Sequence, residues 1–133
     1  MRPILRPALM LLLAAGLSAC ATATTASRPL AGTRWVYGPE RAHNTPELQF
    51  SDGRLSGSTG CNRLMGSYKS DGSTVTWGPI ATTLMACSDP DNPEREVITM
   101  LNAAKSARVE GQELILRDAS GKELGRYRAA DGQ

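Results

Sequence analysis

Short β-type segments separated by glycine-containing turns dominate this chain. The dipeptide Asp52-Gly53 lies between segments 47–50 and 54–57, in which polar and apolar residues alternate. Asp-Gly between two such segments is a strong signal for a two-residue hairpin turn. We therefore predict a hairpin here, and a second one where the same dipeptide recurs, with Asp71-Gly72 between segments 63–69 and 74–77.

The remaining segments extend the β pattern. Alternating or β-rich stretches bounded by glycine or serine predict further strands at 34–37, 107–109, 113–117 and 123–128. About seven or eight short strands are too many for an isolated hairpin sheet and are typical of a small barrel.

A single helix is predicted to begin at about Pro93. Asn92 is placed as its N-cap, Pro93 suits the first helical position, and Glu94 lies in the first turn, where the helix dipole favours negative charge. Its apolar residues form one narrow stripe, made of Val97, Leu101 and Ala104. The sequence thus predicts a mainly β (α+β) fold, a small antiparallel sheet curled into an open or cracked barrel with one packed helix.

Residues 1–19 are typical of an export signal. Arg2 and Arg6 make its start positive, and residues 8–17 form an apolar run. Ten helical residues rise about 15 Å, half of the roughly 30 Å bilayer core, so the run predicts a signal and not a membrane span. The run ends in Leu17-Ser18-Ala19-Cys20, which resembles a lipobox. We expect cleavage after residue 19 and lipidation of Cys20; the alternative is an ordinary cleavage site beside an unrelated cysteine.

Behind the signal, residues 20–29 are small and polar, which predicts a lipidated flexible tether. One domain is expected over residues 30–129. The residue after the cysteine is Ala21, and by resemblance to lipoprotein sorting signals a residue other than aspartate favours the outer membrane, facing the periplasm. The expected partner of the N-terminus is therefore a membrane of the bacterial cell envelope, reached through the lipid on Cys20.

The charge balance excludes one class of partner. The chain carries 15 lysines and arginines and 13 acidic residues, and the surplus lies in Arg2 and Arg6 of the signal. The remaining chain has no net charge, whereas a nucleic-acid-binding domain needs a basic excess. No nucleic-acid partner is expected.

Cys61 and Cys87 form an even pair once Cys20 carries lipid. In an exported chain such a pair predicts a disulfide. The bond would close a loop of about 27 residues, worth about 3–4 kcal/mol in the chain-entropy model. Two free thiols or half of a metal site is the alternative, but the chain has one histidine, so no metal is expected.

Several segments together resemble the META domain family, which includes the HslJ-like heat-shock lipoproteins. Its more specific motifs are Gly60-Cys61-Asn62 and Thr83-Leu84-Met85-Ala86-Cys87. The weaker matches are Leu30-Ala31-Gly32-Thr33-Arg34-Trp35, Phe50, Gly57-Ser58-Thr59, Gly66, Tyr68, Ile80-Ala81-Thr82, and Val109-Glu110-Gly111 with Leu114 and Leu116.

The resemblance implies a small antiparallel β fold with one helix, often exported and lipidated. It also implies a link to stress or drug tolerance without an established catalytic activity. This chain departs from the family where Leu64 and Val97 replace common aromatic residues, so a ligand preference based on aromatics does not carry over.

Four residues are candidates for a binding site: Asn62, Arg63, Trp35 and Trp77. Each also has a structural interpretation, since Asn62 could cap a turn and both tryptophans could belong to the core or the barrel mouth. In the same region, Gly57 and Gly60 suit turn or bulge geometry with positive φ.

No catalytic residues are predicted. His43 is the one imidazole, and it stands in a loop-like stretch without an evident partner. The serine in Gly53-Arg54-Leu55-Ser56-Gly57 is not in the middle position that a nucleophile elbow requires. We expect a protein that is not an enzyme and needs no cofactor.

Two functions remain open from the sequence. The first is a non-catalytic, monomeric envelope lipoprotein that binds or chaperones another envelope protein through a sheet edge or groove. The alternative is a binder of a small apolar ligand or lipid inside a partly open barrel. Low aromatic content and the lack of a convergent polar cluster favour the first.

Overall fold

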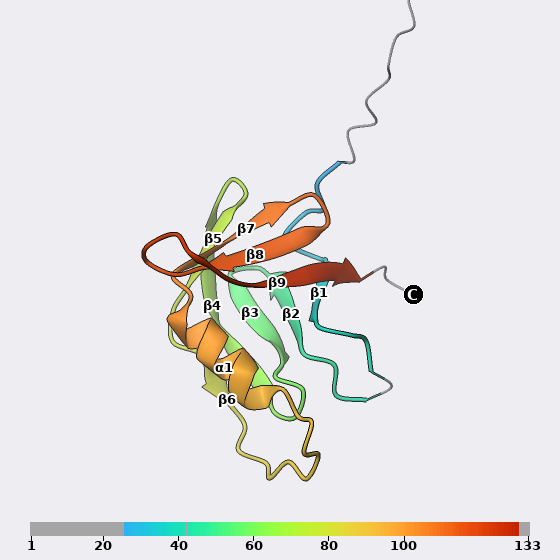
Figure 1. The fold of residues 1–133 in the computed structure, drawn as a ribbon. Coiled ribbons are helices and arrows are strands. Elements are labelled where there is room, and N and C mark those ends of the chain that lie inside the picture. Colours follow the sequence, from blue (N-terminus) through green and yellow to red (C-terminus); the bar gives the residue numbers. More distant parts are fainter. Residues whose placement is uncertain (1–25, 42, 131–133) are drawn as a thin grey trace, which may run out of the picture.

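The computed structural model describes residues 26–41 and 43–130 of the chain (Figure 1). The predicted signal over residues 1–19 and the predicted lipidation site Cys20 lie outside the described residues. So does most of the tether. Its last residues lie along the turn between the seventh and eighth strands, where the Arg28 N–H donates to the Gly111 carbonyl at 2.9 Å.

The described residues form nine strands and one helix. Their bounds are β1 (Arg34–Tyr37), β2 (Glu47–Ser51), β3 (Arg54–Ser58), β4 (Arg63–Asp71), β5 (Thr74–Trp77), β6 (Ala81–Thr82), α1 (Glu94–Ala103), β7 (Ser106–Glu110), β8 (Glu113–Arg117) and β9 (Glu123–Ala130). All eight predicted strand segments are confirmed. The two-residue strand β6 was not predicted, because two residues are too short to show an alternation.

Eight of these strands close into an antiparallel barrel. The hydrogen-bonded order is β3-β2-β1-β9-β8-β7-β5-β4, and β3 also pairs with β4, so the ring has no open edge. The predicted mainly β barrel with one helix is confirmed, and its pairing is continuous. The two narrowest seams have two residue pairs each. They join β1 to β2, and β5 to β7 through Thr74–Arg108 and Val75–Ala107.

Strand β6 lies outside this ring. Along one edge β4 pairs with β3, and along the other its C-terminal half pairs with β5. Near its beginning, on that same second edge, Leu64 and Met65 pair with Thr82 and Ala81 of β6. Figure 1 shows α1 lying below β9 and alongside β6. The helix therefore lies against the barrel beside β9 and β6.

Both predicted hairpins are confirmed, but their turns differ. In the first, Asp52 and Gly53 both adopt positive φ, at 48° and 77°, as a type I′ turn requires. In the second, Asp71 is still paired with Thr74, so the loop is Gly72-Ser73. Gly72 alone supplies the positive φ, at 59°. Asp71 extends the strand instead of opening the turn.

The helix begins one residue later than predicted. Pro93, with φ −80° and ψ 4°, precedes it, and its carbonyl accepts the Val97 N–H at 2.9 Å. The predicted N-cap, Asn92, lies one position further out, where its Oδ1 still accepts the Glu94 N–H at 2.9 Å. Proline has no N–H, so its position just before the helix loses no backbone hydrogen bond of its own. The predicted stripe is confirmed: Val97, Leu101 and Ala104 are all buried.

Side chains fill the barrel interior. The helix packs closely on β9 at Gly125, where an added Cβ would lie 2.3 Å from the Met100 Sδ. Burial of large apolar side chains is the main stabilising force in such a fold. The largest members of the buried cluster are Trp35, Tyr127, Phe50, Leu48, Leu55, Leu64, Leu101, Leu114 and Leu116.

In the part of the chain that the structure describes, no helix combines the length and apolar character needed to cross a membrane.

Candidate binding site around the Cys61–Cys87 disulfide

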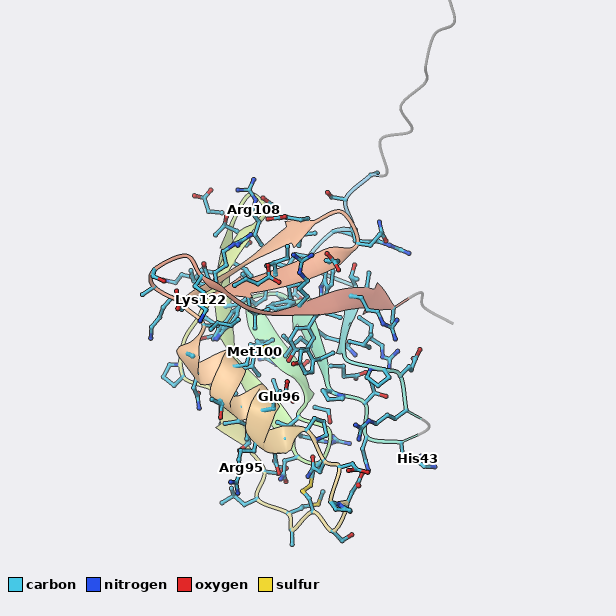
Figure 2. All side chains as sticks on the ribbon, in the orientation of Figure 1. His43, Arg95, Glu96, Met100, Arg108 and Lys122 are labelled. Carbon is cyan, nitrogen blue, oxygen red and sulfur yellow. A yellow bond between two sulfur atoms is a disulfide. The ribbon has the colours of Figure 1, made fainter. Side chains whose placement is uncertain are left out.

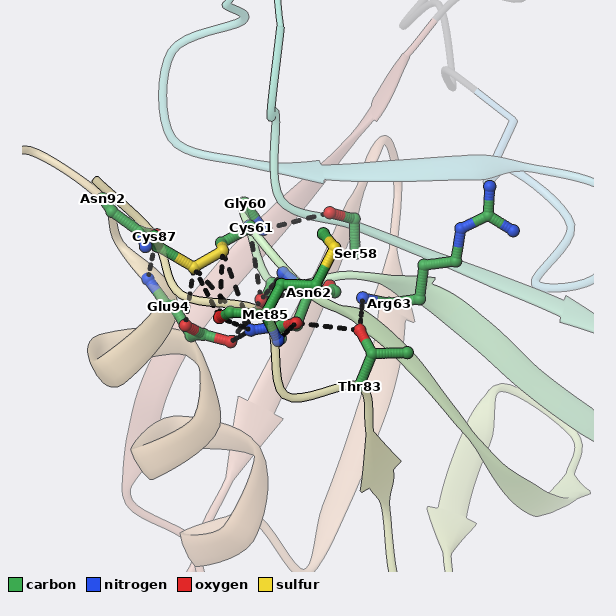
Figure 3. The surroundings of a disulfide bond; sticks show 11 residues. Ser58, Gly60, Cys61, Asn62, Arg63, Thr83, Met85, Cys87, Asn92 and Glu94 are labelled. Atoms are coloured by element: carbon green, nitrogen blue, oxygen red, sulfur yellow. Dashed lines mark hydrogen bonds between the residues drawn. A yellow bond between two sulfur atoms is a disulfide. The ribbon is translucent and has the colours of Figure 1, made fainter. Parts of the chain in front are cut away.

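Three segments meet at the end of the barrel opposite to the entry of the chain near residue 26 (Figure 1). They are the β3–β4 loop over residues 59–62, the segment 83–92 after β6, and the first turn of α1 at Glu94. Figure 3 shows their side chains converging on the sulfurs of Cys61 and Cys87.

The structure joins Cys61 and Cys87 in a disulfide, with the two Cα atoms 6.0 Å apart. This Cα separation lies within the usual range for the bond. Both cysteines are half-buried. The bond ties the β3–β4 loop to the segment that leads into α1, which supports the predicted pairing.

Asn62 lies beneath the disulfide and is 3% exposed. Its Oδ1 accepts the Thr83 hydroxyl at 2.8 Å and the Met85 N–H at 2.7 Å. Its Nδ2 donates to the Glu94 Oε1 at 2.6 Å and to the Met85 carbonyl at 3.2 Å. These four bonds use the full capacity of an amide. Asn62 is therefore a clamp between three segments and has no group left for a ligand.

Thr59 and Glu94 complete this polar cluster. The buried Thr59 Oγ1 accepts the Asn62 N–H at 3.0 Å and lies 3.2 Å from the Glu94 Oε1. Glu94 lies in the first turn of α1, where the helix dipole stabilises a carboxylate. The sequence predicts a role for Glu94 in the helix alone. Its hydrogen bond with Asn62, 32 positions away in the sequence, is visible only in the folded chain.

The same cluster has the composition of a metal-ligand set. One ligand atom each from Cys61, Cys87 and Glu94 lies within 4.8 Å of the others. A metal ion would need both sulfurs as free thiolates. The disulfide uses both, so the cluster in this form has one carboxylate ligand to offer.

Gly60 and Gly57 shape the loop in different ways. Gly60 has φ +97°, as predicted, and an added Cβ would lie 2.9 Å from the Pro93 Cγ. Gly57 does not have the predicted positive φ. It is required by close packing instead, because an added Cβ would lie 1.9 Å from the Glu47 carbonyl oxygen.

The other predicted binding residues are not brought together. Trp35 is fully buried, and its indole N–H donates to the Leu30 carbonyl at 3.1 Å. Trp77 is half-buried, and its indole N–H donates to the Leu101 carbonyl at 3.3 Å, at the C-terminal end of α1. Both tryptophans therefore have structural partners at different places. Arg63 lies next to Asn62 but is exposed.

Exposed apolar side chains surround the disulfide. Among residues 26–41 and 43–130, the exposed large apolar side chains are Leu84 (94%), Met85 (62%) and Met65 (56%). Leu84 and Met85 follow β6 after one intervening residue, and Met65 lies opposite Ala81 of β6 in the ladder. Scattered exposed apolar residues are ordinary, whereas a contiguous apolar patch is typical of interaction surfaces. The motif that contains Leu84-Met85 is visible in the sequence, but the exposure of these two side chains is not.

Two surface grooves border these residues. One, of about 510 Å³, lies between the segment after β6 and α1 and is lined by Leu84, Arg95 and Ile98, among others. The other, of about 520 Å³, lies on the barrel side and is lined by Met65, Met85 and Arg63, among others. The Leu84-Met85 segment is thus a ridge between two grooves.

Titratable groups gather on the opposite side of α1. The Tyr37 hydroxyl donates to the Glu96 Oε1. This hydrogen bond, together with partial burial and the charge of Glu96, raises the pKa of Tyr37 to about 12. Its ring neighbour Tyr127, with centroids 5.3 Å apart, is buried, and burial raises its pKa as well. Figure 2 shows Glu96 on α1, and His43 in a loop away from the helix.

Comparisons with known proteins give a family and a fold. The META domain model matches residues 29–131. A protein from Burkholderia xenovorans, solved by NMR, is 26% identical with a TM-score of 0.59, over 77% of this chain and 85% of that one. A second NMR structure is 28% identical with a TM-score of 0.57, over 77% of this chain and 92% of that one. No curated protein matches the chain.

Proposed function

Because the chain belongs to the META domain family, we propose that it is a non-catalytic envelope lipoprotein that binds or chaperones another envelope protein. Cys20 carries the lipid, the domain faces the periplasm from the outer membrane, and the role is in stress or drug tolerance. The position of residues 26–28 supports the anchored arrangement. These residues lie at the β7–β8 turn, at the opposite end of the barrel from the disulfide.

The observation that carries the protein-binding proposal is the exposed ridge of Leu84 and Met85 beside Met65. An apolar surface at the end of a domain remote from its membrane anchor is accessible to a protein partner. The disulfide and the Asn62 clamp hold this ridge in a fixed position. A rigid surface loses less entropy on binding than a flexible one.

The geometry gives less support to a small apolar ligand or lipid inside the barrel. Such a ligand needs an interior cavity. Buried side chains such as Trp35, Phe50 and Tyr127 occupy the interior, and the grooves described above lie on the surface. A protein partner uses exposed grooves, whereas a buried ligand would have to displace core side chains.

Two observations support a non-catalytic role. In the polar cluster at the disulfide, the side chains of Asn62 and Thr59 both hydrogen-bond to the Glu94 carboxylate. The one imidazole of the chain, on His43, is exposed in a loop between β1 and β2. A general base needs a positioned partner or substrate contact.

Native mass spectrometry of the protein purified from its own envelope tests this proposal. We expect the lipidated chain without a further small ligand, together with a species in which it is bound to a second polypeptide. A stoichiometric apolar ligand that survives extraction, with no protein complex, would replace protein binding by the alternative function.

A further inference from the structure

We propose that β6 is a docking edge, to which an extended segment of another polypeptide adds as a further strand. The incoming segment carries apolar side chains alternating with acidic ones. This inference rests on the proposed protein-binding function and specifies the form of the partner.

The backbone of β6 has an unpaired side. Strand β6 pairs with β4 and is the last strand in the sheet order of the described residues. The Thr83 N–H donates to the Arg63 carbonyl at 3.0 Å, so residues 81 and 83 present their backbone groups to β4. In an antiparallel ladder the intervening residue faces the other way. The N–H and C=O of Thr82 therefore point away from β4, towards the open edge.

Space for a strand exists along this edge. The groove of about 510 Å³ lies between Thr82-Leu84 and α1. A separate hollow of about 300 Å³ lies between Ile80 and the C-terminal half of the helix. A strand added at the usual spacing of about 4.8 Å would lie in this groove. Its backbone would supply the hydrogen bonds that the open edge of β6 lacks.

The side chains around the edge indicate the chemistry of the occupant. Leu84, Met85 and Ile98 line the groove. These residues offer contacts to the apolar side chains of one face of an incoming strand. Because successive side chains of a strand point to opposite faces, such a segment alternates apolar and polar residues.

Charge specifies the polar residues of the incoming strand. Arg95 lines the groove on the helix side, and Arg63 lines the groove on the barrel side. The segment Ala81–Ala86 between them has no charged residue. Each groove also holds a carboxylate, Glu94 in the first and Glu47 in the second, but both carboxylates already have partners within the fold. The two guanidinium groups therefore favour acidic side chains on the partner.

An extended segment fits better than a second copy of this chain. Two copies paired edge to edge would bring Arg63 and Arg95 of each copy close to those of the other. A foreign strand with acidic residues avoids this repulsion.

A defined probe tests the proposal: a phage-displayed library of random linear 12-residue peptides, selected against the full protein in detergent. We expect enriched peptides with alternating apolar and acidic residues. Thr82→Pro removes the outward N–H and should weaken their binding about tenfold, whereas Thr82→Val keeps the N–H and should bind like wild type. Leu84→Ser should weaken binding to a similar degree, while Lys122→Ser, in the remote β8–β9 loop, should not.

Hydrogen–deuterium exchange of the wild-type protein decides the matter even if Thr82→Pro fails to fold. Bound peptide should protect the Thr82 amide. Strand addition is wrong if the Thr82 amide stays unprotected, or if the peptide affinities are insensitive to both Thr82→Pro and Leu84→Ser. It is also wrong if the chain instead dimerises through β6 or inserts Leu84 into lipid vesicles. If the envelope complex is nevertheless seen by native mass spectrometry, protein binding stands and only its form is wrong.

Discussion

At the scale of single residues, polar groups around the disulfide hold the fold, while neighbouring apolar side chains are exposed. Asn62 bonds to Thr83, Met85 and Glu94, so its importance is structural although it lies at the candidate site. Leu84 is 94% exposed, and the fold does not require its side chain to be apolar. Substitutions at these two positions should therefore have opposite effects on stability and on binding.

Asn62→Ala should lower the free energy of unfolding by about 2–3 kcal/mol. It leaves the Glu94 carboxylate, the Thr83 hydroxyl and the Met85 N–H without their partner in a partly buried place. Asn102→Ala, on the exposed face of α1, is the matched control and should change stability by less than about half a kcal/mol. Urea unfolding measures the free energy of unfolding of both variants. Equally small losses would show that the hydrogen bonds of Asn62 do not stabilise the fold.

Tyr37 should make stability depend on alkaline pH. Its folded pKa of about 12 lies above the ordinary value of 10, so the protonated phenol is favoured in the folded state. The contribution is complete below pH 10 and is lost as the pH rises towards 12. Thermal midpoints measured from pH 9 to pH 12 should fall less in Tyr37→Phe than in wild type. The same fall in both proteins would mean that the Glu96 hydrogen bond is absent in solution.

At the scale of elements, the disulfide and the helix hold together parts of the chain that strand pairing does not join. The bond holds the loop before β4 against the segment after β6, and α1 packs on β9 at Gly125. Neither the bond nor the helix packing depends on a long strand ladder. Both should therefore be sensitive to changes that the rest of the barrel would tolerate.

The double substitution Cys61→Ser/Cys87→Ser should cost about 2–5 kcal/mol of stability, since it releases a loop in the unfolded chain that the bond constrains. Intact-mass analysis of wild type under an alkylating agent should find both thiols protected until a reductant is added. Two alkylated thiols without reduction would contradict the bond. A stoichiometric zinc ion would assign the Cys61–Cys87–Glu94 cluster to metal binding instead.

Leu101→Ala should cost about 2–5 kcal/mol, because Leu101 is 2% exposed within the core stripe of α1. Thr99→Ala, on the exposed side of the same helix, should change stability by less than about half a kcal/mol. Small and equal losses in urea melts would indicate that α1 does not contribute to the core.

Periodic elements were the ones that the sequence could predict. The hairpin at Asp52-Gly53 and the stripe through Val97 and Leu101 follow local rules that act over a few residues. The two-residue strand β6 and the bond between Asn62 and Glu94 depend on contacts across the chain. The exposure of Leu84 was equally hidden, because an isolated apolar pair in a sequence gives no sign of which side of it meets water.

At the scale of the whole molecule, the two ends of the barrel have different surroundings. The chain enters beside the β7–β8 turn near Gly111, and the apolar ridge lies at the other end, beyond the disulfide (Figure 1). In the proposed arrangement, a lipid on Cys20 holds the first end near a membrane. The ridge then faces the periplasm.

Cys20→Ser tests the anchor on which this arrangement depends. Two or more acyl chains, at about 0.8 kcal/mol per buried CH₂, anchor stably where one chain binds reversibly. The variant should be found in the soluble fraction or remain unprocessed, whereas wild type should fractionate with the outer membrane in a density gradient. A variant of mature size that stays with membranes as tightly as wild type would refute lipid anchoring at this position.

The central claim is that the ridge after β6 contacts another protein in the envelope, and site-specific photo-crosslinking in living cells tests it most directly. A photoreactive amino acid at position 84 should give an adduct with a second polypeptide. The same group at the exposed position 76 on β5, away from the ridge, should not. No adduct at position 84, or the same adducts at both positions, would contradict the claim.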